Sequence, residues 1–323
     1  MKNFITSQGH NFTSLKNLGK IGVIMGGLSS ERDISLKSGE AVYNNLKQAG
    51  IEVVAIDIET ENSGENIRLL KDAKIDCAFL ALHGRFGEDG QIQQILEDLN
   101  IAYTGSGVEA SRLAMDKIAS RQVFKSAGLN VPNYREIISL QADASENLEN
   151  FNFPLVIKPV THGSSIGLSI VDKAEHFKVC LREAFKFDKR VIIEEYIAGR
   201  EITVGILDQE ALPVIEIIPK KRFFDFEAKY SLGSTEYIVP AKLEREITTQ
   251  IQMAGLSAHK SLGCYGCSRV DMILGKDNLP FILEVNTIPG LTETSLLPKA
   301  AKAKGVSFAE LCIKLIQLAY EKT

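Results

Sequence analysis

From Lys20 onward, short hydrophobic runs alternate with segments of helical periodicity. The runs are "IGVIMGG", "EVVAIDI" and "DCAFLAL", and helical patterns at "SGEAVYNNLKQAG" and "NIRLLKDA" separate them, with "GQIQQILEDLN" next in the chain. This alternation predicts βαβ units and a parallel sheet. Ligands of such sheets bind at the carboxyl ends of the strands, where the loops carrying Glu31 and His83 are expected.

A change of pattern follows "SAGLNVPNY", where Gly128 can end a helix and Pro132 prevents its resumption. A second unit begins near there, with strand "PLVIKPV", a glycine-serine turn, strand "LSIV", helix "AEHFKVCLREAF" and strand "RVIIEEYI". Beyond about residue 200 come strands "EITVGIL" and "LPVIEII", a helix, two strands around a turn, and a closing helix.

The two late strands carry charged side chains where hydrophobic ones are expected. Period-2 alternation puts Arg269 and Asp271 on one face of "SRVDMIL", and Ile282, Glu284 and Asn286 on one face of "FILEVN". The intervening "GKDN" predicts a hairpin. If the two faces coincide, three oxygen ligands converge in the way that suits magnesium shared with phosphate oxygens. The alternative is a structural network in which Arg269 pairs with one carboxylate.

The segment "TIPGLTETS" follows directly, and its Pro289-Gly290 turn can point a backbone N–H at a ligand. Together with Arg269, that N–H would form an oxyanion site.

Two further segments have polar groups at strand ends. Lys158 ends an apolar strand before the Gly163-Ser164-Ser165 turn, which could present N–H and hydroxyl donors to a phosphate or could be an ordinary hairpin connection. Glu194, Glu195 and Glu201 surround another strand end, where they are either solvated carboxylates or acceptors for adenine and ribose groups. The sequence has no Walker loop.

The stretch at 222–237, "RFFDFEAKYSLGSTEY", is aromatic, charged and without periodicity. It predicts a lid loop that closes over a site, with packing of its phenylalanines in the core as an equal alternative.

Composition narrows the class of protein. The 37 basic and 41 acidic residues give a net charge of −4, so no nucleic-acid partner is expected. The five scattered cysteines favour a reducing compartment. Neither a signal peptide nor an apolar run of ~18 residues is evident, so we expect a cytoplasmic protein without a membrane segment.

Several ordered motifs together resemble the D-alanine:D-alanine ligase family of the ATP-grasp superfamily. They are "GGLSSERDISLKSG", "LALHGRFGEDG", "GSGVEASRLAMDK", "KPVTHGSSIG", "DFEAKY", "GCSRVD" and "LEVNTIPGLTETSLLP". The resemblance implies an α/β protein with an N-terminal parallel-sheet, Rossmann-like domain followed by a two-part ATP-grasp fold. The implied divisions are an extension at 1–19, an N-terminal domain at 20–115, a central subdomain at 116–199 and a C-terminal subdomain at 200–323.

The resemblance also implies a nucleotide and metal site. ATP would be a co-substrate, with Lys117, Lys158 and Lys229 near its phosphates and Glu194, the Ile197 backbone and Glu201 around adenine and ribose. Asp271, Glu284 and Asn286 would hold two magnesium ions, with Glu284 bridging them and manganese a possible substitute.

For the amino acids, Glu31 would bind the ammonium group of the first D-alanine, with His83 nearby. Ser164 and Tyr230 would join Glu31 in a hydrogen-bonded set that tethers the lid. Arg269 and the Gly290 N–H would stabilise the oxyanion, and Ser295 would take the carboxylate of the second substrate.

The implied reaction is the ATP-dependent ligation of two D-alanines through an acyl phosphate, giving ADP and phosphate for peptidoglycan precursor synthesis. Members of the family are typically homodimers. Two alternatives remain: a relative that makes D-alanyl-D-lactate, which tends to carry phenylalanine in place of Tyr230, and a non-catalytic nucleotide-binding regulator. The predicted lid departs from the common family sequence at Phe224 and Phe226, where tyrosines are frequent. His162 stands where the family often has an acidic residue.

Overall fold

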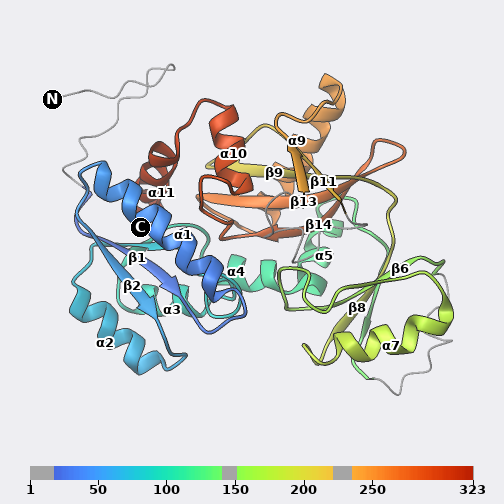
Figure 1. Ribbon diagram of the computed structural model, residues 1–323, viewed down its shortest axis with the longest axis horizontal. Coiled ribbons are helices and arrows are strands. Elements are labelled where there is room, and N and C mark those ends of the chain that lie inside the picture. Colours follow the sequence, from blue (N-terminus) through green and yellow to red (C-terminus); the bar gives the residue numbers. More distant parts are fainter. Residues whose placement is uncertain (1–17, 140–150, 221–234, 323) are drawn as a thin grey trace.

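The computed structural model describes residues 18–139, 151–220 and 235–322, which form three β-sheets with flanking helices (Figure 1). Within these ranges, no helix is both long and apolar enough to cross a membrane. All five cysteines are free thiols.

The first sheet is parallel, in the order β2-β1-β3-β4, as the alternating pattern predicts. Its strands are β1 (Ile21–Gly26), β2 (Val53–Ile58), β3 (Cys77–Leu80) and β4 (Ala102–Tyr103), and its helices are α1 (Arg32–Gln48), α2 (Ser63–Ala73) and α3 (Gln91–Asp98). Glu31 is the residue before α1, and His83 follows β3. Both therefore lie at the carboxyl edge of this sheet, where they were expected.

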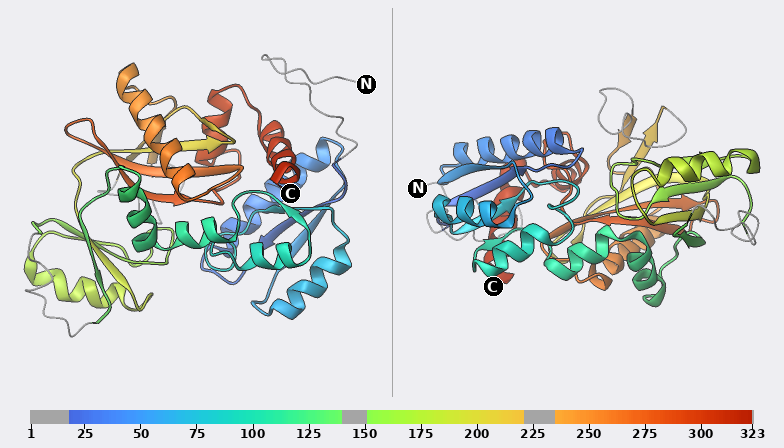
Figure 2. Two further views of the ribbon diagram at one scale, coloured as in Figure 1. Left: turned by 180° about the vertical axis from the view of Figure 1, so that it is seen from behind. Right: turned by 90° about the horizontal axis from the view of Figure 1, so that it is seen from below.

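Helices α4 (Val108–Met115) and α5 (Lys117–Ser126) run from the N-terminal sheet toward the central one (Figure 2). The central sheet has the order β5-β8-β6-β7 and is antiparallel throughout. It consists of β5 (Tyr134–Ile137), β6 (Leu155–Pro159), β7 (Ser169–Val171) and β8 (Val191–Glu195), with α7 (Ala174–Ala184) packed on it.

The largest sheet has the order β12-β11-β9-β13-β14, with β10 paired to β9. Its strands are β9 (Gly199–Leu207), β10 (Glu210–Ala211), β11 (Ile215–Pro219), β12 (Thr235–Ile238), β13 (Cys267–Gly275) and β14 (Pro280–Asn286). The remaining helices are α9 (Arg245–Ser261), α10 (Leu296–Ala303) and α11 (Phe308–Lys322). Helix α9 covers the hydrophobic face of this sheet, whereas α10 and α11 join the core of the first sheet, with α11 beside α1 (Figure 1).

Part of the predicted lid is a strand. Residues 235–237 belong to β12, where Tyr237 lies opposite Ile217 of β11. The pairing with β11 extends the sheet by one edge strand and fixes these residues in the extended conformation. The rest of the predicted lid lies outside the described residues.

The alternation predicted for β14 is wrong at one position. The β13–β14 hairpin forms as expected, but Asp271 pairs with Glu284 while the next residue, Met272, pairs with Ile282. Leu283 is therefore the extra residue of a β-bulge, which reverses the alternation before it. Ile282 consequently faces the core rather than sharing the face of Glu284, and its side chain is fully buried.

Candidate active site

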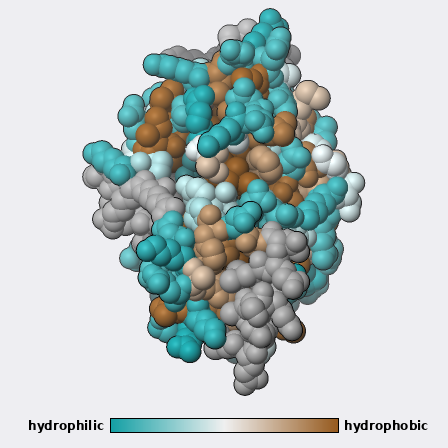
Figure 3. All heavy atoms as spheres, turned by 90° about the vertical axis from the view of Figure 1, so that its right-hand side faces the viewer, coloured by the Kyte–Doolittle hydropathy of each residue, from teal (hydrophilic) through white to brown (hydrophobic). Residues whose placement is uncertain are grey.

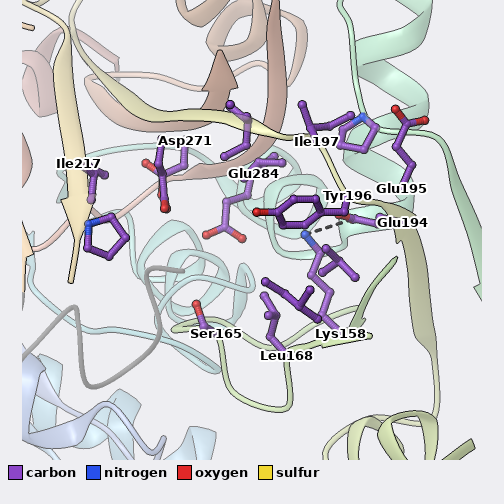
Figure 4. Close-up of a pocket in the computed structure, with 18 of the residues that line it drawn as sticks. Lys158, Ser165, Leu168, Glu194, Glu195, Tyr196, Ile197, Ile217, Asp271 and Glu284 are labelled. Carbon is purple, nitrogen blue, oxygen red and sulfur yellow. Dashed lines mark ion pairs between the residues drawn. The ribbon is translucent and has the colours of Figure 1, made fainter. Parts of the chain in front are cut away.

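A pocket of about 470 Å³ lies between the central sheet and the largest sheet (Figure 4). Seven residues expected at the nucleotide and metal site line it: Lys117, Lys158, Glu194, Ile197, Glu201, Asp271 and Glu284. On the α7 side of the molecule, hydrophobic residues lie among hydrophilic ones, both in the middle of the face and toward its edges (Figure 3). The structure thus brings the expected nucleotide residues together around one cavity.

Lys158 and Glu194 form an ion pair at the wall of this pocket. Lys158 lies on β6 and Glu194 on β8, the neighbouring strand, and the distance from Nζ to Oε1 is 3.0 Å (Figure 4). Burial lowers the pKa of Lys158 to about 8, against the opposing effect of Glu194. Glu194 is only 2 % exposed, so it is a buried, ion-paired carboxylate and not the solvated carboxylate of the alternative.

Lys117 begins α5 and points toward the same cavity. The side chain of Asp116 caps this helix by accepting hydrogen bonds from the N–H groups of Ile118 and Ala119. The ammonium of Lys117 donates to the His162 carbonyl at 2.6 Å and lies 3.9 Å from Glu284 Oε2. A cation is thereby placed beside the carboxylate expected to bind metal.

The acidic face of the β13–β14 hairpin fits a magnesium site that uses substrate phosphates. Asp271 and Glu284 lie directly opposite each other, although like charges in that position are unfavourable. Asn286 Nδ2 donates to Asp271 Oδ2 at 3.1 Å, so its amide belongs to the same group. No cluster of three or more His, Cys, Asp or Glu ligands occurs in the described parts of the chain. Magnesium needs only one or two carboxylates when phosphates complete its coordination, and the donor set present here fits that type of site.

Arg269 forms the ion pair that the structural alternative required. Its Nε and Nη2 donate to the two oxygens of Asp271 at 2.9 and 2.7 Å, and Thr203 Oγ1 donates to Asp271 Oδ1 at 2.6 Å. This bidentate contact holds the guanidinium of Arg269 at the end of the acidic face. The ion pair and a metal role for Asp271 are compatible, because a carboxylate has several acceptor positions.

Glu31 and Ser164 meet across the molecule, as the resemblance implied. Ser164 Oγ donates to Glu31 Oε1, joining residues 133 positions apart. Glu31 is buried, and two glycines leave it room: a Cβ on Gly84 would lie 2.8 Å from Glu31 Oε2, and one on Gly163 would lie 3.4 Å from it. The contact connects the N-terminal sheet to the β6–β7 turn.

His83 lies between α1 and the segment after β14. Its Nε2 is 3.1 Å from Ser38 Oγ, which also accepts a hydrogen bond from the Leu291 N–H at 3.4 Å. Burial, reinforced by the positive charge of Arg269, lowers the pKa of His83 to about 4. The imidazole is therefore neutral at physiological pH.

Sequence reasoning missed Glu88 as a site residue. Its Oε2 accepts a hydrogen bond from the Gly84 N–H at 2.7 Å, and it lines a small cavity together with Lys117 and Glu284. Burial raises the pKa of Glu88 to about 8, and the negative charge of Glu31 adds to the effect. The available signal was its place in "FGEDG", directly after the loop that carries His83.

Gly290 and Ser295 lie close together after β14. A Cβ on Gly290 would lie 3.0 Å from Ser295 Oγ, so a side chain at position 290 would crowd the serine hydroxyl. Ser295 Oγ accepts from the Thr292 N–H at 3.1 Å and lies at the start of α10. Lys229 and Tyr230, the expected lid residues, lie outside the described residues.

Comparison with known proteins identifies this arrangement. Two family models match, described as "D-ala D-ala ligase N-terminus" over residues 20–68 and 62–106 and "D-ala D-ala ligase C-terminus" over residues 123–317. A D-alanine–D-alanine ligase from Geotalea uraniireducens is 47% identical over 300 residues, which are 93% of this chain and 95% of that protein. One from Trichlorobacter lovleyi is 48% identical over 306 residues, or 94% and 96% of the two chains.

Solved structures of similar proteins point to the same family. A D-alanine–D-alanine ligase from Bacillus anthracis, complexed with ATP, has a TM-score of 0.84 at 37% identity and covers 94% of this chain and 98% of its own. The VanG D-Ala:D-Ser ligase from Enterococcus faecalis has a TM-score of 0.79 at 32% identity, covering 93% and 99%. The fold is thus that of an ATP-grasp enzyme. The chain belongs to the D-alanine–D-alanine ligase family.

Proposed function

We propose that this enzyme uses ATP to join two D-alanines into D-alanyl-D-alanine for peptidoglycan precursors, releasing ADP and phosphate. The observation that carries the proposal is the convergence of Lys117, Lys158 and the Asp271–Glu284 face on one pocket. The family membership and the ATP complex of the Bacillus anthracis ligase support it.

The nucleotide would lie in the pocket between the central and largest sheets. Lys117 and Lys158 would contact the phosphates, with Lys229 joining them from the predicted lid. Glu194, the Ile197 backbone and Glu201 would hold adenine and ribose. Two cations facing one cavity can neutralise the phosphoryl oxygens while the terminal phosphate is transferred.

Asp271, Glu284 and Asn286 would hold magnesium, for which manganese could substitute. Bound magnesium would supply further neutralisation of the phosphate oxygens and orient them for transfer. Asn286 would then turn its amide oxygen toward the ion, and Arg269 would retain its contact with Asp271. The paired carboxylates of β13 and β14 are suited to this because the strands fix their separation.

The first D-alanine would place its ammonium group at Glu31 and its carboxylate toward the phosphates. A free carboxylate is a poor electrophile, and its phosphorylation makes an acyl phosphate with a good leaving group. Ser164 would hold Glu31 in position, and Tyr230 would extend this hydrogen-bonded set to the lid. His83, neutral and anchored by Ser38, would line the same substrate site.

The amine of the second D-alanine would attack the acyl phosphate. Ser295 would bind its carboxylate, while Arg269 and the Gly290 N–H would stabilise the oxyanion that forms. Closure of the lid would keep water from hydrolysing the acyl phosphate. The enzyme would act in the cytoplasm, as a homodimer.

The test is phosphate release with ATP, magnesium and either D- or L-alanine, followed by identification of the product. We expect turnover that depends on D-alanine and yields a dipeptide. Parallel assays with D-alanine plus D-serine or D-lactate separate this function from those of D-Ala:D-Ser and D-lactate-using relatives. Absence of D-alanine-dependent phosphate release would refute the proposal.

A further inference from the structure

Of the residues that the structure describes, Arg121 has the largest side chain that is completely buried. It lies on α5, one turn after Lys117, and its exposed fraction is 0%. A guanidinium removed from water is costly unless a partner compensates its charge. Its contacts should therefore show what the charge is for.

The carboxylate that pairs with Arg121 is Glu194. Arg121 Nη2 forms an ion pair with Glu194 Oε1 and donates to the Leu283 carbonyl at 3.3 Å. Its Cζ lies 5.8 Å from the ring centre of Tyr134, the residue opposite Glu194 on β5. Among the described residues, Nε and Nη1 have no hydrogen-bond partner. The desolvation of Arg121 is thus offset mainly through Glu194.

Glu194 consequently has two cations on one oxygen, because Lys158 Nζ also lies 3.0 Å from Oε1. Arg121 does not line the pocket, whereas Glu194 and Lys158 do (Figure 4). A phosphate in the pocket would compete for Lys158 but not for the enclosed Arg121. Arg121 would therefore continue to stabilise the negative charge of Glu194 when the pocket is filled. An ionised carboxylate is purely a hydrogen-bond acceptor.

We propose that Arg121 is a positioning residue that selects the nucleobase by fixing Glu194 as an acceptor in the pocket. This inference rests on the proposed function, which puts the nucleotide there. Adenine carries an amino group at position 6, which donates to such an acceptor. Hypoxanthine and guanine carry a carbonyl at position 6, which places two acceptors against each other. The pocket then discriminates by charge and not only by shape.

The test compares ATP with inosine triphosphate, which differs from ATP at position 6 of the base. The wild-type enzyme should favour ATP by about 100-fold or more in kcat/KM, since an acceptor facing a carbonyl is left without its hydrogen bond. In Arg121→Met, this ratio should fall about tenfold. Arg121→Lys, which keeps the charge, should stay near the wild-type ratio.

The matched control is Lys125→Met. Lys125 is one turn further along α5, exposed, and also over the Tyr134 ring at 4.6 Å. The Lys125→Met variant should leave the ratio of kcat/KM for ATP to that for inosine triphosphate unchanged. An equal loss of both activities in Arg121→Met, with the ratio intact, would mean that the side chain only supports the fold and would overturn the proposal. A ratio in Arg121→Lys as low as in Arg121→Met would overturn it too.

A second measurement decides the matter if Arg121→Met does not fold. Binding of ADP and inosine diphosphate to the wild-type enzyme by calorimetry, without any amino acid, should show the same preference, and equal affinities would overturn the proposal. Glu194→Gln, whose amide can both donate and accept, should bring the two affinities to within about tenfold. These arms need no ligase turnover, so they separate failure of this inference from failure of the proposed function.

Discussion

Two pairs of carboxylates face the centre of the molecule, and their surroundings differ. Asp271 and Glu284 lie opposite each other on β13 and β14. Arg269 forms a bidentate ion pair with Asp271, and Lys117 lies 3.9 Å from Glu284. Glu31 and Glu88 lie at the edge of the parallel sheet, where neutral groups donate hydrogen bonds to them. Ser164 donates to Glu31, and the Gly84 N–H donates to Glu88.

The difference shows two ways to tolerate neighbouring acids. On the hairpin, Arg269 and Lys117 balance the charge of the two acids, and the pair can receive a further cation. At the sheet edge, one acid retains a proton: burial and the charge of Glu31 raise the pKa of Glu88 to about 8. The first pair is suited to binding metal and phosphate, and the second to presenting a single negative charge to an ammonium group.

The comparison is tested most strongly at Glu284. Glu284→Gln should lower kcat for phosphate release by about 1,000-fold or more, because it removes a charged metal ligand without changing volume. Thermal unfolding should remain cooperative. Asp277→Asn, an exposed change in the turn of the same hairpin, is the control and should keep full activity. Full activity in Glu284→Gln would show that the acidic face does not hold the metal.

Glu31→Gln should act on the amino acid and not on the nucleotide. Loss of the charge should raise the KM for the first D-alanine by about 100-fold, since a charge-assisted hydrogen bond to ammonium is lost, while the KM for ATP stays nearly constant. Steady-state kinetics in both substrates measure this, with the exposed Glu40→Gln on α1 as control. A rise confined to ATP would reverse the assignment of the two acidic pairs.

Ser164→Ala should have a smaller effect of the same kind, about tenfold on the D-alanine KM, because it removes a single hydrogen bond to Glu31. A double-mutant cycle sharpens the result. If the serine acts only through Glu31, the double variant should be no worse than Glu31→Gln alone. Additive losses would show that Ser164 acts elsewhere.

The last expected effect is on stability and not on catalysis. Because Glu88 binds its proton more tightly when folded than when unfolded, its contribution is complete below its usual pKa of 4.5 and is lost as the pH rises toward about 8. Glu88→Gln removes this loss. Without added metal, the variant should gain about 4 kcal/mol relative to the parent between pH 4.5 and 8. Urea unfolding at the two pH values measures it, and a constant difference would contradict the assigned protonation.

The sequence predicts the hairpin pair better than the edge pair, for a physical reason. Asp271 and Glu284 follow from strand alternation and a turn, which are local properties of the chain. The protonation of Glu88 depends on burial and on Glu31, which is distant in sequence. Arg121 was missed for the same reason, since a basic residue in a helix is ordinarily exposed. The predicted alternation of side chains also failed at Ile282, because nothing in the sequence pattern marks the extra residue of a β-bulge.

That bulge makes the length of β14 a constraint in its own right. With Leu283 present, Ile282 reaches the core and Glu284 still meets Asp271. A chain one residue shorter at this point could keep its hydrophobic contact or its acidic pair, but not both. Related sequences should therefore tolerate a change in the identity of residue 283 far more readily than its deletion.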